Sequence, residues 1–121
     1  MLNRESSVDD VFKYIEDPQV GGPLKVVLFV DQGDLCTQYT NVSQRWLSME
    51  NIPVVEVCGH IQETFQIGKV PQMRFWFAGS EIYDEVGKIT YQEYLEIKRD
   101  LLGKINLTSE QRRKLSLEVV T

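Results

Sequence analysis

The segment LKVVLFV, residues 24–30, is the feature that most constrains the fold of this chain. It is a short, nearly continuous apolar run that is rich in β-branched residues. Such a run is typical of a β-strand that is covered on both faces, which favours a central position and parallel pairing in a sheet. The sequence therefore predicts an α/β fold with residues 24–30 at the centre of the sheet.

A helical pattern follows this strand from Cys36 onward, because apolar residues recur at steps of three and four. The stripe predicted to be buried consists of Tyr39, Val42, Trp46 and Met49. The residues expected to face mostly solvent are Thr40, Asn41, Ser43, Gln44 and Arg45. The segment PVVEVC, residues 53–58, then predicts a second strand. A strand, a helix and a strand of these lengths form a right-handed crossover with parallel strands.

Other elements are predicted on either side of this crossover. Ser7 and Asp10 form a capping-box pattern that opens an N-terminal helix. Residues 60–67 are predicted to form a short helix or a turn that ends at Gly68. The segment VPQMRFWFAGSEIYDEVG, residues 70–87, predicts a β-hairpin because two strand-like runs are separated by a turn at residues 78–80.

A last helix is predicted from a capping pattern at Thr90 through about Leu102, and Gly103 is expected to end it. We therefore place one domain at residues 1–103. A C-terminal tail, predicted to be helical, occupies residues 104–121.

The order of these elements resembles the thioredoxin superfamily, with a cysteine at the start of the crossover helix and a valine-proline pair entering the hairpin. In the hairpin, Pro71 stands at the place of the family's cis-proline, and Gln72 replaces the threonine that usually follows it. Gly79 and Gly87 match the family's two glycines. The resemblance covers residues 7–102. It implies a thioredoxin-like α/β fold with a central mixed sheet of about four strands, flanked by helices.

The chain departs from this family at its dithiol motif. The family's Cys-x-x-Cys sequence reads Cys36-Thr37-Gln38-Tyr39 here. Without a second thiol at Tyr39, a mixed disulfide on Cys36 cannot be released intramolecularly at this motif. The buried acid of the preceding strand is also missing, and the few residues before the first helix leave little room for the family's additional N-terminal strand.

Cys36 remains a candidate nucleophile, since a helix start stabilises a thiolate. Asp31 and Asp34 oppose this reading by adding negative charge, which leaves an inert and partly buried thiol as the alternative. Cys58 either lies near Cys36 or behaves as a small hydrophobic residue at a strand end. His60 either serves as a base beside Cys36 or begins the short helix.

Charge and composition narrow the expected partners. A net charge of −5 argues against nucleic acid or an anionic membrane as the main partner. No apolar run reaches the length of a membrane span. The N-terminus lacks the apolar core of a signal peptide, so a cytoplasmic location is expected. Two cysteines and one histidine cannot build a closed zinc site without other ligands, and we expect no cofactor.

The resemblance implies that function lies at the edge that carries Pro71. A cis X-Pro bond turns the preceding backbone outward, which leaves the N–H and C=O of Val70 free to pair with an extended peptide. We therefore predict a non-redox protein-binding or adaptor module with Tyr39, Val70, Pro71 and Gln72 as binding residues. For Tyr39, membership of the core is an equal alternative. The alternative function is a monothiol thiol-disulfide oxidoreductase, or a glutathione-linked redox enzyme, that uses Cys36. The oligomeric state is left open.

Overall fold

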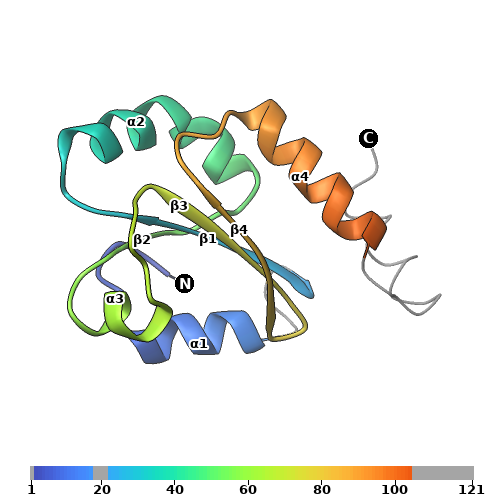
Figure 1. Cartoon of the computed structure of the whole chain (residues 1–121), viewed down its shortest axis with the longest axis horizontal. Coiled ribbons are helices and arrows are strands. Elements are labelled where there is room, and N and C mark those ends of the chain that lie inside the picture. The colour runs from blue at the N-terminus through green and yellow to red at the C-terminus, as the bar shows by residue number, and fades with distance from the viewer. Residues whose placement is uncertain (1, 18–21, 105–121) are drawn as a thin grey trace. The chain divides into compact units, whose positions relative to one another are not determined.

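The predicted central strand forms as β1 (Leu24–Val30), in a four-stranded sheet of order β2-β1-β3-β4 (Figure 1). β1 pairs in parallel with β2 (Val54–Glu56) and antiparallel with β3 (Gln72–Phe77). β4 (Ser80–Val86) pairs antiparallel with β3 and forms one edge of the sheet. The sheet is therefore mixed, and the predicted fold class is confirmed. β2 is shorter than the predicted strand over residues 53–58.

The structure is a computed structural model that describes residues 2–17 and 22–104. The chain divides into two units, Met1–Thr90 and Tyr91–Thr121, and each unit is described by itself. The first unit contains the whole sheet and the helices α1, α2 and α3. The second unit contains α4.

The hairpin formed by β3 and β4 is confirmed. Its turn contains Ala78 with φ of 50° and Gly79 with φ of 86°. This left-handed conformation favours glycine, because a Cβ atom crowds the backbone there. Phe75 pairs with Tyr83 before an irregularity in the register that lies between Phe75 and Trp76.

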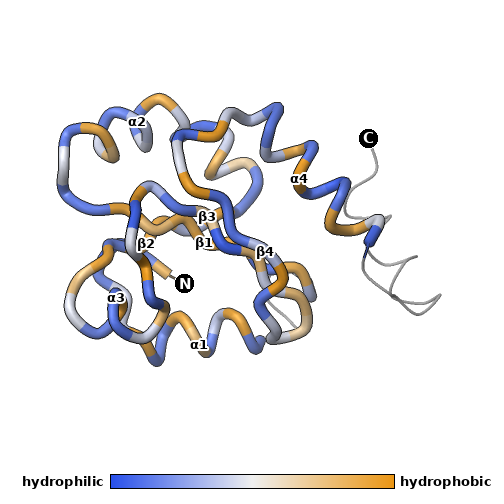
Figure 2. Tube along the Cα trace, in the orientation of Figure 1, coloured by the Kyte–Doolittle hydropathy of each residue, from blue (hydrophilic) through white to orange (hydrophobic). Residues whose placement is uncertain are grey.

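One face of the sheet is covered by α1 (Val8–Glu16) and α3 (His60–Phe65) (Figure 1). Phe65 of α3 packs against the sheet in an aromatic cluster. Its ring centroid is 5.5 Å from that of Phe29 in β1 and 6.2 Å from that of Trp76 in β3. The other buried residues of this core are Leu2, Val11, Ile15, Val27, Val55, Ile61 and Ile67. Figure 2 shows that β1 is largely hydrophobic along its length, which is why it occupies the middle of the sheet.

The predicted capping box opens α1. The Asp10 N–H donates to Ser7 Oγ at 3.2 Å, and the Ser7 N–H donates to Asp10 Oδ2 at 3.0 Å. These two bonds satisfy backbone donors that an open helix start leaves without partners. Hydrogen bonding to Ser7 also lowers the pKa of the Asp10 carboxyl.

The opposite face of the sheet is covered by α2 (Asp34–Met49) (Figure 1). Of the predicted buried stripe, Tyr39 is buried and Trp46 is half-buried, whereas the prediction is wrong for Val42 and Met49. Val42 is 84% exposed and Met49 is 59% exposed. The buried residues of α2 are Cys36, Tyr39, Thr40, Ser43 and Leu47. Thr40 tolerates burial because its hydroxyl lies 3.0 Å from the Cys36 carbonyl oxygen, within hydrogen-bonding distance.

The N-terminal segment lies beside β2. The Glu56 N–H donates to the Arg4 carbonyl at 3.0 Å, and Leu2 is buried in the core. No strand is assigned within described residues 2–7. The segment therefore lies along part of β2 without an assigned strand of its own.

The second unit begins with α4 (Tyr91–Lys104), whose buried residues are Tyr94 and Leu101. The rings of Tyr91 and Tyr94 stack with centroids 6.5 Å apart. The predicted end at Gly103 is wrong by one residue, since the helix includes Lys104. The predicted helical tail from residue 105 onward lies outside the described residues, and the predicted domain boundary at 103 stays a prediction.

Candidate functional site

Four loops meet at the edge of the sheet where β1 ends. Phe29 pairs with Gln72, Gln72 pairs with Val86, and the Val57 N–H donates to the Val30 carbonyl at 2.7 Å. The chain therefore brings together the segments that follow β1, β2 and β4 and the segment that precedes β3. We call this surface the Pro71 edge; it consists of residues 31–33, 57–59, 68–71 and 87–88.

Cys36 lies in the first turn of α2, behind this edge. Its side chain is 1% exposed. Burial raises the pKa of its thiol, and the charge and side-chain hydrogen bond of Asp31 act in the same direction. A hydrogen bond from the Asp31 backbone and the charge of Arg4 lower it, but the net shift is upward. Burial and the raised pKa both disfavour the thiolate, which is the more nucleophilic form of a cysteine.

The start of α2 also lacks a side-chain cap. Gly33 is the N-cap residue, and its own N–H donates to Asp31 Oδ1 at 2.9 Å. Asp31 thus organises the loop that enters the helix, and this position keeps its carboxylate beside the thiol. The helix dipole favours a thiolate at Cys36, but burial and the nearby carboxylate outweigh it.

Tyr39 occupies the position of the family's second thiol, and its side chain faces inward. The residue is 7% exposed, and its hydroxyl donates to the Ile89 carbonyl at 2.7 Å. The bond joins α2 to the segment after β4, within the first unit. The hydroxyl already has a partner inside the domain, so Tyr39 has the geometry of a core residue.

Cys58 and His60 are exposed, whereas Cys36 is buried. Both cysteines are free, with Cys36 buried and Cys58 exposed at the Pro71 edge. The His60 side chain is 93% exposed and lies 3.8 Å from the Glu63 carboxylate. A solvated imidazole beside an acid does not act on a thiol that is closed off from solvent.

The peptide bond between Val70 and Pro71 is cis. Pro71 is fully buried, and its carbonyl accepts a hydrogen bond from the Gly87 N–H at 2.9 Å. Val70 is half-buried. Within the described part of the chain, neither its N–H nor its C=O takes part in a hydrogen bond. The backbone of Val70 therefore retains a donor and an acceptor at this edge.

Gln72 is placed differently from Val70. Its side chain is buried, and its Oε1 accepts a hydrogen bond from Arg74 Nε. Arg74 also donates to the Gln66 carbonyl at 3.3 Å and to Glu81 at 3.2 Å. Arg74 thereby ties the segment after α3 to the hairpin. The sequence pattern missed this role; the only signal for it is an arginine within the apolar strand MRFWF.

Across residues 2–17 and 22–104, no group of three or more His, Cys, Asp or Glu side chains is arranged to hold a metal ion. Among those same residues, no helix has both the length and the apolar character needed to cross a bilayer.

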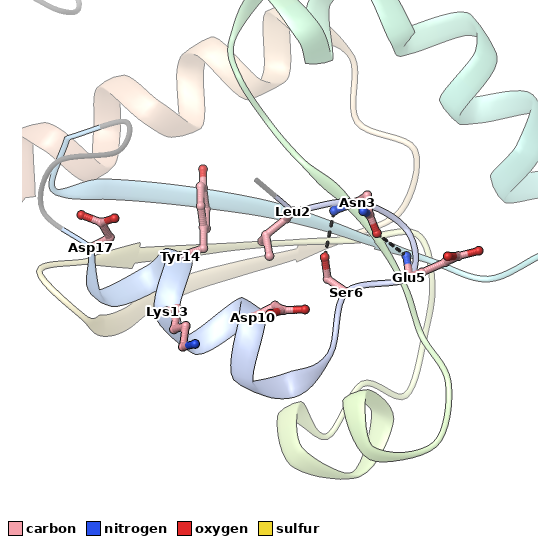
Figure 3. A pocket seen from close by; sticks show the side chains of 8 residues that line it. All are labelled: Leu2, Asn3, Glu5, Ser6, Asp10, Lys13, Tyr14 and Asp17. Atoms are coloured by element: carbon pink, nitrogen blue, oxygen red, sulfur yellow. Dashed lines mark hydrogen bonds between the residues drawn. The ribbon is translucent and has the colours of Figure 1, made fainter.

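A cavity of about 440 Å³ lies elsewhere, between the N-terminal segment and α1 (Figure 3). Its charged lining residues are Glu5, Asp10, Lys13 and Asp17. Among the other lining residues, the Asn3 N–H donates to Ser6 Oγ at 2.8 Å. None of the predicted binding residues lines this cavity.

The first unit has the arrangement of a thioredoxin: a mixed four-stranded sheet, a cysteine in the first turn of the crossover helix, and a cis-proline that enters the hairpin. Comparison with solved structures supports the same fold. The chain is similar to thioredoxin f2 of Chlamydomonas reinhardtii, with a TM-score of 0.63 and 16% identity over 83% of this chain and 95% of that chain.

Two further thioredoxins give the same picture. The similarity to the Malassezia sympodialis protein has a TM-score of 0.64 and 17% identity, over 80% of this chain and 90% of that one. The similarity to the Fasciola hepatica thioredoxin has a TM-score of 0.65 and 18% identity, over 82% of this chain and 98% of that chain. No protein-family model and no curated protein sequence matches the chain. At these identities the likeness establishes the thioredoxin fold and no activity.

Proposed function

We propose that this protein is a non-redox protein-binding module that holds an extended segment of a partner protein along the Pro71 edge. The observation that carries the proposal is the state of Cys36, which is 1% exposed and has a raised pKa. A thiol in this state is poorly suited to attack a disulfide, because the attacking species is an accessible thiolate. In this proposal the domain uses the Pro71 edge for binding and carries out no thiol-disulfide exchange there.

The binding mode is supported by the backbone of Val70. Its N–H and C=O have no hydrogen-bond partner within the described residues, while the neighbouring Pro71 carbonyl is bonded to Gly87. An extended peptide satisfies such a donor and acceptor by pairing as a short strand. The net charge of −5 is consistent with a protein partner in preference to nucleic acid. A cytoplasmic location stays part of this proposal.

Two of the predicted binding residues have an indirect part in this proposal. The Tyr39 hydroxyl is bonded to Ile89 and Gln72 is bonded to Arg74, so neither side chain is directed at a partner. Their contribution is to hold the segments on either side of the edge. Direct contact is therefore assigned to Val70 and to the loop residues around Pro71.

The competing function is thiol-disulfide exchange by Cys36. Reduction of a model disulfide in the presence of glutathione separates the two functions, with wild type compared with Cys36→Ser and Cys58→Ser. We expect no turnover above background in any of the three proteins. Turnover that disappears in Cys36→Ser and survives in Cys58→Ser would show that the thiol is catalytic and would overturn the proposal.

The binding edge is tested by capturing partners from cell extract with wild type, Cys36→Ser and Pro71→Ala. We expect Cys36→Ser to retain the captured protein and Pro71→Ala to lose it, after thermal unfolding has confirmed that both variants are folded. Amide hydrogen exchange on the purified complex then locates the contact. Slower exchange at Val70 supports strand-like pairing, whereas protection confined to other surfaces refutes it.

A further inference from the structure

A second cavity, of about 280 Å³, lies on the other side of the N-terminal segment, against α2 and β2. Its polar lining comes mainly from Arg4, Thr40, Asn41 and Gln44, and its apolar lining includes Leu47 and Ile52. We call it the Arg4 cavity. Its size lies near the lower end of the range for ligand cavities, which is about 300–1,000 Å³, so it suits a small molecule.

Arg4 is held in place at this cavity by both its backbone and its side chain. Its carbonyl accepts from the Glu56 N–H at 3.0 Å, and its Nη2 donates to Thr40 Oγ1 at 3.1 Å. Thr40 is itself buried and anchored, since its hydroxyl lies 3.0 Å from the Cys36 carbonyl. A guanidinium carries several N–H donors. The bond to Thr40 uses one of them, and because Arg4 is exposed the others are open to a ligand.

The electrostatic character of the Arg4 cavity differs from that of the cavity beside α1. No carboxylate lines the Arg4 cavity, where the polar groups other than arginine are hydroxyls and amides. The cavity of Figure 3 contains Glu5, Asp10 and Asp17 together with Lys13. In a chain of net charge −5, a pocket with an anchored cation and no acid is the more favourable place for an anion.

The floor of the Arg4 cavity is formed by core residues. Leu47 is 3% exposed and Ile52 is 5% exposed, so they close the cavity from below and present little apolar surface to a ligand. Asn41 and Gln44, on the outer side of α2, supply amide groups beside the arginine. We propose that the Arg4 cavity binds a small anion whose oxyanion head, carboxylate or phosphate, meets Arg4.

The proposal is tested by titrating the full chain with hexanoate while recording amide nitrogen–proton NMR spectra. We expect saturable shifts at Asn41, Gln44 and Ser48. Hexanamide has nearly the same shape without the charge and should bind at least about tenfold more weakly, because a charge-assisted bond to arginine is lost. Inorganic phosphate is an oxyanion without a chain and should shift the same three amides; no saturable shift there with either phosphate or hexanoate would overturn the proposal.

Two charge variants complete the experiment. Arg4→Gln should weaken hexanoate binding at least about tenfold, whereas Lys13→Gln, which removes the cation of the other cavity, should leave it unchanged. Equal binding of hexanoate and hexanamide to wild type would overturn the proposal without reference to any variant. Shifts centred on Asp10 and Asp17 would also overturn it, because they would place the ligand beside α1.

Discussion

Replacing Tyr39 with phenylalanine removes one hydroxyl from a buried hydrogen bond and leaves the ring in place. In the folded protein this hydroxyl donates to the Ile89 carbonyl at 2.7 Å, and the two residues are 7% and 4% exposed. The variant therefore leaves a buried carbonyl without its partner. It distinguishes a Tyr39 that holds the domain together from a Tyr39 that is kept for a bound peptide.

The expected loss follows from the burial of this bond. A typical intramolecular hydrogen bond contributes about 0.5–1.5 kcal/mol to stability, and an unsatisfied buried partner raises the cost to about 1–3 kcal/mol. Because the Ile89 carbonyl is almost closed to water, we expect Tyr39→Phe to lower the free energy of unfolding by about 1–3 kcal/mol. In a domain of this size each kcal/mol corresponds to a fall of about 4–8 °C in the melting temperature.

The assay is equilibrium unfolding in urea, followed by tryptophan fluorescence. Trp76 is buried in the core of the first unit and reports on the sheet. Tyr83→Phe is the matched control, because the Tyr83 hydroxyl makes an exposed bond of 2.9 Å to Glu85. The control should change the free energy by no more than about 0.5 kcal/mol. If Tyr39→Phe is no less stable than Tyr83→Phe, the structural role assigned to Tyr39 is wrong.

Other outcomes can be checked with the same protein. A thiol reagent should modify Cys58 rapidly in the native state and Cys36 only after unfolding, because Cys58 is exposed and Cys36 is buried. Burial raises the pKa of Cys36 in the folded state. The folded chain therefore binds more protons above the unfolded thiol pKa of about 8.5. Its stability should fall as the pH rises through that region, and it should fall more in wild type than in Cys36→Ala. Leu47→Ala should cost about 2–5 kcal/mol, whereas Val42→Ala, at an exposed site, should stay within about 0.5 kcal/mol; urea unfolding measures both. Ser7→Ala should cost about 1 kcal/mol by the same assay, since it removes one half of the capping box.

Local patterns predicted most of the fold correctly. The apolar run over residues 24–30 formed the central strand, and Ser7 with Asp10 formed the capping box. The hairpin turn formed at Ala78 and Gly79. Each of these features depends on residues that are close together in the sequence, so the sequence pattern was sufficient to predict it.

The prediction of which α2 residues are buried was partly wrong, and the reason is physical. Hydrophobicity favoured Val42 and Met49 as core residues, but the structure buries Thr40 and Ser43. The Thr40 hydroxyl finds a bond partner on its own helix, at the Cys36 carbonyl, and it accepts a bond from Arg4 Nη2. Periodicity alone does not reveal such hydrogen bonds.

The burial of charged residues was also not predicted by the sequence pattern. Lys25 lies inside the apolar run of β1 and is 1% exposed, with its ammonium 5.1 Å from the centre of the Tyr14 ring. Such a cation over an aromatic face is stabilised by the ring quadrupole. Arg74 is likewise anchored by groups on β4 and on the segment after α3. Long-range partners of this kind become visible only when the chain is folded.

The chemistry of the candidate site depends on the residues around Cys36 as well as on its position in the fold. A helix start favours a thiolate, yet burial raises the pKa of Cys36, and the carboxylate of Asp31 adds to this. Asp31→Asn removes the negative charge and keeps an oxygen for the bond from the Gly33 N–H. We therefore expect Asp31→Asn to lower the pKa of Cys36 relative to wild type, but not below that of an ordinary thiol, because the side chain stays buried.

The ultraviolet absorbance of the thiolate, recorded against pH in a Cys58→Ser background, measures this pKa directly. Asp34→Asn, at the exposed first position of α2, is the control that should leave it unchanged. A pKa below the ordinary thiol value in Asp31→Asn would mean that a single carboxylate holds back a reactive site. The binding function would then have to be reconsidered as a suppressed redox function. A pKa that stays high would mean that burial alone keeps the thiol protonated, and the Pro71 edge would remain a surface for binding.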